Sequence, residues 1–73
     1  MGKAEGEAIS ALWHVIYNDK CTYSKEQRIE AIRSLGAYLS NEEATGHLHS
    51  VIHDANKYPD DLRMAAIQVL GKR

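Results

Sequence analysis

The sequence predicts an all-α domain of four helices, arranged as two consecutive helix–loop–helix units. Two observations support this fold class: apolar residues recur at helical spacing through most of the chain, and the second half of the chain repeats the first. Residues 23–36 and 58–71 share six of fourteen positions, whereas unrelated segments would share roughly one. The identical pairs are Tyr23/Tyr58, Arg28/Arg63, Ala31/Ala66, Ile32/Ile67, Leu35/Leu70 and Gly36/Gly71.

The repeat extends upstream of these segments with an offset of 36 instead of 35 residues. The loop before Tyr23 is therefore one residue longer than the equivalent loop before Tyr58. The matched residues there are Ala8/Ala44, Leu12/Leu48, Val15/Val51 and Ile16/Ile52. We therefore predict a single domain over residues 1–73, with a first repeat at about 5–40 and a second repeat at 41–73.

A first helix is predicted over about residues 3–17, because an apolar stripe at i, i+3, i+4 and i+7 contains Ile9, Leu12, Trp13 and Ile16. After a short polar loop, Ser24 has the pattern of an N-cap whose capping box is completed by Gln27. The second helix then carries Ile29, Ile32, Leu35 and Leu39 on one face.

A glycine in a helix interior costs about 1 kcal/mol relative to alanine, so the recurrence of Gly36 as Gly71 indicates a structural role. Either the helix ends near this glycine in a left-handed C-cap, or neighbouring backbone approaches too closely for a Cβ atom.

Ser40 and Glu43 form a second Ser-x-x-Glu pattern, which predicts a third helix from about Asn41 to Ala55. Its apolar stripe consists of Ala44, Leu48, Val51, Ile52 and Ala55. Pro59 fits the first position of the fourth helix, near whose N-terminus acidic side chains are favourable. This helix is predicted to bury Leu62, Ala66, Ile67 and Leu70.

Residues 27–36 and 61–71 resemble the signature helix of HEAT-like repeats, in the subclass named after phycobilisome lyases. Helices of that subclass read like acid-x-Val-Arg-x-x-Ala-Ala-x-Ala-Leu-Gly. The resemblance implies a short stack of antiparallel helix pairs that serves as a binding scaffold without chemistry of its own. It also implies structural roles for Arg28 and Arg63, which occupy the arginine position commonly tied to acidic groups of neighbouring helices.

Composition restricts the functional classes. A chain of 73 residues is near the lower limit for a self-sufficient core, and its 44% apolar and 26% charged residues are typical of a soluble globular protein. The net charge of -1 provides no global attraction for nucleic acid or anionic membrane. Cys21 has no disulfide partner, no stretch reaches the roughly 18 apolar residues of a membrane span, and residues 1–6 show no signal-peptide pattern. We therefore expect a cytoplasmic location and no membrane partner.

Two repeats are few, because about three stacked repeats are normally needed for stability. The chain is therefore expected either to close into a compact four-helix bundle or to stack against a second copy. A homodimer is the corresponding hypothesis.

The internal alignment pairs Trp13 with His49 and Tyr17 with His53. Trp13 and Tyr17 are i and i+4 in the first helix, and His49 and His53 have the same spacing in the third, so each of these two pairs shares one face of its helix. If equivalent faces lie side by side, these four residues form one partner-binding stripe. The alternative is that Trp13 belongs to the core, Tyr17 is half-buried and both histidines are simply solvated. The stripe favours a non-enzymatic protein–protein interaction module, a small regulator or adaptor, without indicating which protein it binds.

The histidines and the cysteine allow two further interpretations, a metal site and a catalytic pair. His49 and His53 have a spacing that two metal-ligating imidazoles can use, but His47 points the other way and no zincin glutamate follows, so neither metal nor cofactor is expected. A Cys21/His14 pair is conceivable, yet helix pairs of this length offer little concavity, so we do not expect an enzyme.

The alternative function is a nucleic-acid-associated regulator. Basic residues of the second and fourth helices could merge into one strip, formed by Lys25, Arg33, Lys72 and Arg73. Interleaved acidic residues, namely Glu26, Glu30, Asp60 and Asp61, are more typical of a salt-bridged, solvated surface.

Overall fold

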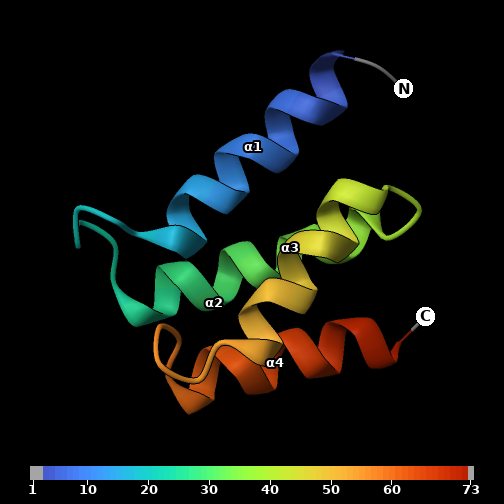
Figure 1. Cartoon of the computed structure of the whole chain (residues 1–73). Coiled ribbons are helices and arrows are strands. Elements are labelled where there is room, and N and C mark those ends of the chain that lie inside the picture. The colour runs from blue at the N-terminus through green and yellow to red at the C-terminus, as the bar shows by residue number, and fades with distance from the viewer. Residues whose placement is uncertain (1–2, 73) are drawn as a thin grey trace.

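A computed structural model describes residues 3–72 of the chain, and this part is entirely helical apart from its turns and loops. The elements are α1 (Lys3–Tyr17), α2 (Lys25–Ser34), a 3₁₀ turn η1 (Leu35–Tyr38), α3 (Glu42–His53) and α4 (Asp60–Gly71). Helices α1 and α2 form one hairpin, α3 and α4 form a second, and α2 lies beside α4 (Figure 1). The predicted all-α fold with four helices is confirmed.

The first loop is fixed by Asn18, whose left-handed backbone (φ 54°) ends α1. Its side chain accepts a hydrogen bond from the Tyr23 N–H (3.0 Å) and donates one to the Tyr23 carbonyl (3.2 Å). The Ser24 hydroxyl then accepts from the Gln27 N–H (3.1 Å), while the Gln27 side chain accepts from the Ser24 N–H (2.9 Å). The predicted capping box is confirmed, and α2 begins at the next residue.

Gly36 lies in η1, where the regular α-helix has already ended. Its φ is not in the left-handed region, and a Cβ atom placed on it would stand 3.4 Å from Cγ1 of Val69 in α4. A distance of 3.4 Å to a side-chain methyl group is an ordinary van der Waals contact, so the structure supports neither of the two expected roles at Gly36. A Cβ atom on Gly71 would meet open space, so neither role applies there within the described chain.

The predicted start of the third helix was wrong by one residue, because Asn41 and not Ser40 is the N-cap of α3. The Asn41 side-chain oxygen accepts from the Glu43 N–H (2.8 Å), and its amide nitrogen donates to the Glu5 carboxylate of α1 (2.8 Å). The Asn41 N–H also bonds to the Tyr38 carbonyl (2.9 Å), which closes the turn after η1. This turn shifts the cap by one residue, and α3 ends at His53, short of the predicted Ala55.

Replacing Asn41 by alanine is expected to lower the free energy of unfolding by about 1–2 kcal/mol, because it removes the cap of α3 and the hydrogen bond to α1. Ser40→Ala is the matched control and is expected to change stability by less than about 0.5 kcal/mol. Urea denaturation followed by circular dichroism measures both. An equal or larger loss for Ser40→Ala would contradict the capping role of Asn41.

In α4 the predicted buried face is partly wrong. Leu62 and Ala66 are buried as expected, but Ile67 is 50% exposed and Leu70 is only partly buried. The inward positions are taken instead by Ala65 and Val69. Helix α4 packs against α2, α3 and η1, and within residues 3–72 no helix covers its outer side. Pro59 precedes the helix as its N-cap residue and is not the first helical residue.

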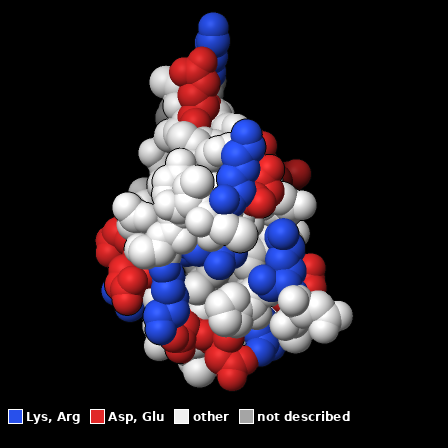
Figure 2. All heavy atoms as spheres, turned by 90° about the vertical axis from the view of Figure 1, so that its left-hand side faces the viewer, with Lys and Arg blue, Asp and Glu red and all other residues white. Residues whose placement is uncertain are grey.

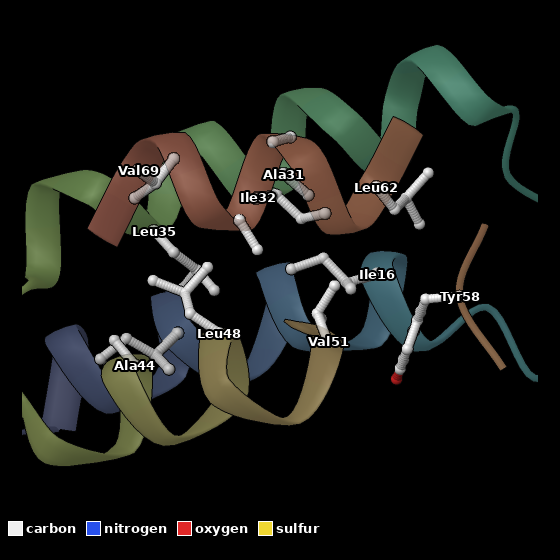
Figure 3. Packing of buried hydrophobic residues seen from close by; sticks show 13 residues of the cluster. Ile16, Ala31, Ile32, Leu35, Ala44, Leu48, Val51, Tyr58, Leu62 and Val69 are labelled. Carbon is white, nitrogen blue, oxygen red and sulfur yellow. The ribbon is translucent and has the colours of Figure 1, made fainter. Parts of the chain in front are cut away.

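The core lies between the two hairpins and receives side chains from every helix (Figure 3). Its largest fully buried side chains are Ile9, Ile16, Ile32, Leu35, Leu48, Leu62 and Val51. Tyr58, in the loop before α4, closes one end of this core and is 2% exposed. Among residues 3–72, no helix combines the length and apolar character needed to cross a membrane.

Candidate protein-interaction surface

Four aromatic side chains from three segments pack together beside the core. We call Trp13, Tyr17, His47 and Tyr58 the aromatic cluster. The rings of Trp13 and His47 are stacked, with centroids 4.2 Å apart and planes inclined by 5°. Tyr17 and Tyr58 approach Trp13 at centroid distances of 5.8 and 6.4 Å with tilted rings. Offset and tilted contacts of this kind are the favourable geometries for aromatic pairs.

A lysine ammonium group covers the exposed edge of the aromatic cluster. The Nζ atom of Lys57 lies 3.8 Å from the centroid of the Tyr17 ring and 5.8 Å from that of Tyr58. On the inner side, the Arg28 guanidinium carbon is 5.9 Å from the Tyr58 centroid. Tyr17 is 42% exposed, so it is the member of the cluster most available to another molecule.

A shallow hollow of about 210 Å³ adjoins the cluster along α1. It is lined by Ser10, Trp13, His14, Tyr17 and Asp19. Aromatic rings thus form part of its wall, while hydroxyl, imidazole and carboxylate groups provide polar contacts. A hollow of this size is smaller than the roughly 300–1,000 Å³ of pockets that enclose drug-sized ligands, and it can receive a side chain of a partner.

Burial shifts the pKa of each of the two inner rings of the cluster in the direction that favours its uncharged form. Burial raises the pKa of Tyr58 to about 12, against the opposing effect of the Arg28 charge. Burial also lowers the pKa of His47 below 6.5, although the Glu43 carboxylate, 3.8 Å away, acts in the other direction. Burial therefore favours the neutral form of His47 in its stack on Trp13.

The structure divides the predicted partner-binding stripe into two pairs. Trp13 and Tyr17 belong to the aromatic cluster, whereas His49 and His53 are exposed and lie together with ring centroids 6.1 Å apart. Among residues 3–72, neither of these histidines makes an aromatic contact with Trp13 or Tyr17. His47 occupies that place because the side of α3 that faces α1 is the side opposite His49.

Sequence reasoning missed three contributors to this surface: His47, Lys57 and Tyr58. The identity of Tyr23 and Tyr58 in the internal alignment was the available signal that Tyr58 is more than a loop residue. His47 carried no such signal, since its role depends on which side of α3 faces α1. Lys57 carried none either, since its place over Tyr17 depends on how the loop before α4 lies against α1.

The predicted basic strip is only partly assembled. Arg33 and Lys72 line one hollow of about 170 Å³ between α2 and α4. Lys25 lies 2.9 Å from the Asp61 carboxylate, with which it forms an ion pair, and Arg73 lies outside the described residues. On the face shown in Figure 2, positive and negative side chains are interspersed without a continuous region of one sign.

The two arginines of the repeated signature do different things. The Nε and Nη2 atoms of Arg28 donate hydrogen bonds of 3.0 and 2.7 Å to the Ile16 carbonyl in the last turn of α1. Arg63 instead forms an ion pair with Asp60 in the first turn of its own helix. The family resemblance implied that both arginines pair with acidic groups of neighbouring helices. Within residues 3–72, neither arginine does so. Arg28 rather connects α2 to the C-terminus of α1.

No family model, curated protein or solved structure matches this chain. The HEAT-like resemblance therefore remains a prediction that depends on the two signature segments. In the part of the chain that the structure describes, no three His, Cys, Asp or Glu side chains are grouped so that they could hold a metal ion. Cys21 is exposed in the first loop.

Proposed function

We propose that this chain is a non-enzymatic protein-interaction module, a small regulator or adaptor, which binds part of a partner protein on its aromatic cluster. The observation that carries the proposal is the placement of Tyr17. It is 42% exposed, it packs against Trp13, and it borders a hollow large enough for a side chain. Tyrosine and tryptophan are enriched among the residues that dominate binding energy at protein interfaces.

Pre-organisation of the cluster supports the same proposal. The Trp13 ring is already held by His47 on one side and by Tyr58 on another. A partner would therefore meet rings whose rotamers are fixed before binding, which reduces the entropy lost on association. Lys57 and Asp19 add one charge of each sign at the edge, as expected for the polar rim of an interface.

The expected result of replacing Tyr17 by alanine is at least about tenfold weaker binding of the partner, because the exposed anchor of the cluster is removed. The tagged chain would first capture partners from nuclease-treated lysate, and calorimetry would then measure their affinity for each variant. His53→Ala is the matched control, since His53 is also an exposed aromatic residue near the end of a helix but lies away from the cluster.

Equal binding by Tyr17→Ala and the unmodified chain, with circular dichroism showing both folded, would contradict the proposal. Capture that disappears after nuclease treatment would favour the alternative function instead. In that case Arg33→Glu and Lys72→Glu should weaken binding, because these two residues share one hollow. The alternative has less support, since Lys25 is already paired with Asp61.

A further inference from the structure

We infer that the partner presents an arginine side chain, which binds in the hollow at the C-terminal end of α1, against the rings of Trp13 and Tyr17 and the carboxylate of Asp19. This inference rests on the proposed function, because it uses the same surface, and it adds the chemistry of the group that is recognised. The hollow has a volume of about 210 Å³, and its lining comes from α1, from Ser10 onward, and from the loop that follows α1 (Figure 1).

The charge of the lining favours a positive group. Asp19 contributes the one carboxylate, and no lysine or arginine of residues 3–72 lines the hollow. The Asp19 side chain is exposed and forms no ion pair within the described chain, whereas Asp60 and Asp61 each pair with a cation of their own chain. An unpaired carboxylate at the edge of an aromatic hollow attracts a cation and repels a phosphate or a second carboxylate.

The first loop holds Asp19 in place before a partner arrives. The Cys21 N–H donates to the Asn18 carbonyl (3.0 Å), which makes Asp19 and Lys20 the two central residues of a tight turn. Asn18 and Cys21 both have left-handed backbones, with φ of 54° and 56°, and the Asn18 side chain bonds to the backbone of Tyr23. The backbone that carries the carboxylate is therefore fixed relative to the end of α1, which lowers the entropy lost on binding.

The aromatic walls of the hollow suit the same kind of group. The chain already places one cation on this cluster, because Nζ of Lys57 lies 3.8 Å from the centroid of the Tyr17 ring. Lys57 does not line the hollow, so the parts of Trp13 and Tyr17 that border it remain open to a second cation. Tryptophan is the ring that attracts cations most strongly, and tyrosine has the same kind of electron-rich face.

The C-terminal end of α1 adds a third attraction. The last carbonyls of a helix form the negative end of its dipole, where positive groups are favourable. Arg28 already uses this end, since its Nε and Nη2 atoms donate to the Ile16 carbonyl. Tyr17 is the last residue of α1, so a cation held between Tyr17 and Asp19 lies at the same end. The charges of Arg28 and Lys57 oppose a further cation, and we therefore expect a single short peptide to bind weakly.

Arginine fits these features better than lysine does. Its planar guanidinium stacks on an aromatic face and can donate two parallel hydrogen bonds to a carboxylate. It is also less strongly hydrated than an ammonium group, so it loses less hydration free energy when it enters a hollow that is partly walled by rings. The Ser10 hydroxyl in the lining offers a further acceptor for the remaining N–H groups.

Two blocked tripeptides test the inference, one with arginine and one with citrulline between two glycines. Citrulline has nearly the same shape as arginine and no charge, so the comparison isolates the charge. Trp13 is the only tryptophan of the chain, and its indole N–H gives one NMR signal that reports on the hollow. We expect the arginine peptide to shift this signal saturably, with a dissociation constant on the order of 1 mM, and the citrulline peptide to bind at least about fivefold more weakly.

Asp19→Asn tests the carboxylate, because asparagine keeps the size of the side chain and removes its charge. The arginine peptide should bind this variant about threefold more weakly than the unmodified chain. Glu30→Gln is the matched control, since it makes the same change of net charge at an exposed residue of α2 that lines a different hollow. It should bind the arginine peptide like the unmodified chain.

Three results would overturn the inference: no saturable shift of the Trp13 signal up to about 20 mM arginine peptide, equal affinity for the two peptides, or equal affinity of Asp19→Asn and Glu30→Gln for the arginine peptide. A failure of the proposed function is measured separately, by Tyr17→Ala against the captured partner protein. A partner that binds Tyr17→Ala weakly but Asp19→Asn normally would leave the proposed function standing and show that the recognised side chain is not an arginine.

Discussion

Replacing Ile32 by alanine is expected to lower the free energy of unfolding by about 2–5 kcal/mol, whereas the same change at Ile67 should cost less than about 1 kcal/mol. The two isoleucines are identical, occupy equivalent positions of the repeat and lie in equivalent helices. Ile32 is 0% exposed in the core, and its truncation leaves a cavity surrounded by packed side chains. Ile67 is half exposed, and water fills the space that its truncation leaves.

Urea denaturation of both variants at low protein concentration, where self-association is negligible, measures this difference. A loss of this size is comparable to the whole stability expected for a domain of this length, so Ile32→Ala is expected to be largely unfolded. Ile32→Val provides a graded version, with an expected loss of about 0.5–1.5 kcal/mol. Equal losses at positions 32 and 67 would contradict the different burial of the two repeats.

The second large effect is expected at high pH and comes from Tyr58. Its pKa is about 12 in the folded chain and 10.0 as the ordinary value, because burial disfavours the phenolate. A raised pKa in the folded state means that the neutral form contributes full stability below pH 10. That stability is lost as the pH rises from 10 to about 12, where the unfolded chain releases this proton and the folded chain does not. Two units of pKa correspond to a loss of about 2–3 kcal/mol.

Urea denaturation at pH values between 9 and about 12 measures this loss, and Tyr58→Phe is the control. Phenylalanine keeps the ring but has no ionisable hydroxyl, so the variant should lose less stability than the unmodified chain over this interval. The difference between the two curves isolates Tyr58 from lysines and other groups that titrate in the same range. Parallel curves for the two proteins would show that Tyr58 is not held neutral by burial.

Local patterns predicted most of the helices. The stripe from Ile9 to Ile16 and the Ser24/Gln27 capping box placed α1 and the start of α2 correctly, because these signals involve residues within one or two turns of each other. At the start of α3, Ser40 and Asn41 are both suitable caps, and the choice between them depended on the turn that follows η1. A local pattern does not contain that turn.

The candidate site was predicted only in part. Trp13 and Tyr17 were identified because aromatic residues at i and i+4 share one face of a helix. Their actual neighbours, His47 and Tyr58, come from α3 and from the loop before α4. The expected neighbour His49 lies on the other side of α3, because the packing of two helices selects one face and a sequence pattern does not say which.

The sequence by itself determined that this protein is helical, that the residue pattern of its first half recurs in its second half, and where the helices begin and end to within a few residues. Only the tertiary structure decided which copy of each repeated residue is buried. Ile32 and Ile67 carry the same side chain in the same local pattern, yet one has a helix packed over it and the other faces water. Burial depends on what lies across a surface, and within residues 3–72 no helix packs over Ile67 as one does over Ile32.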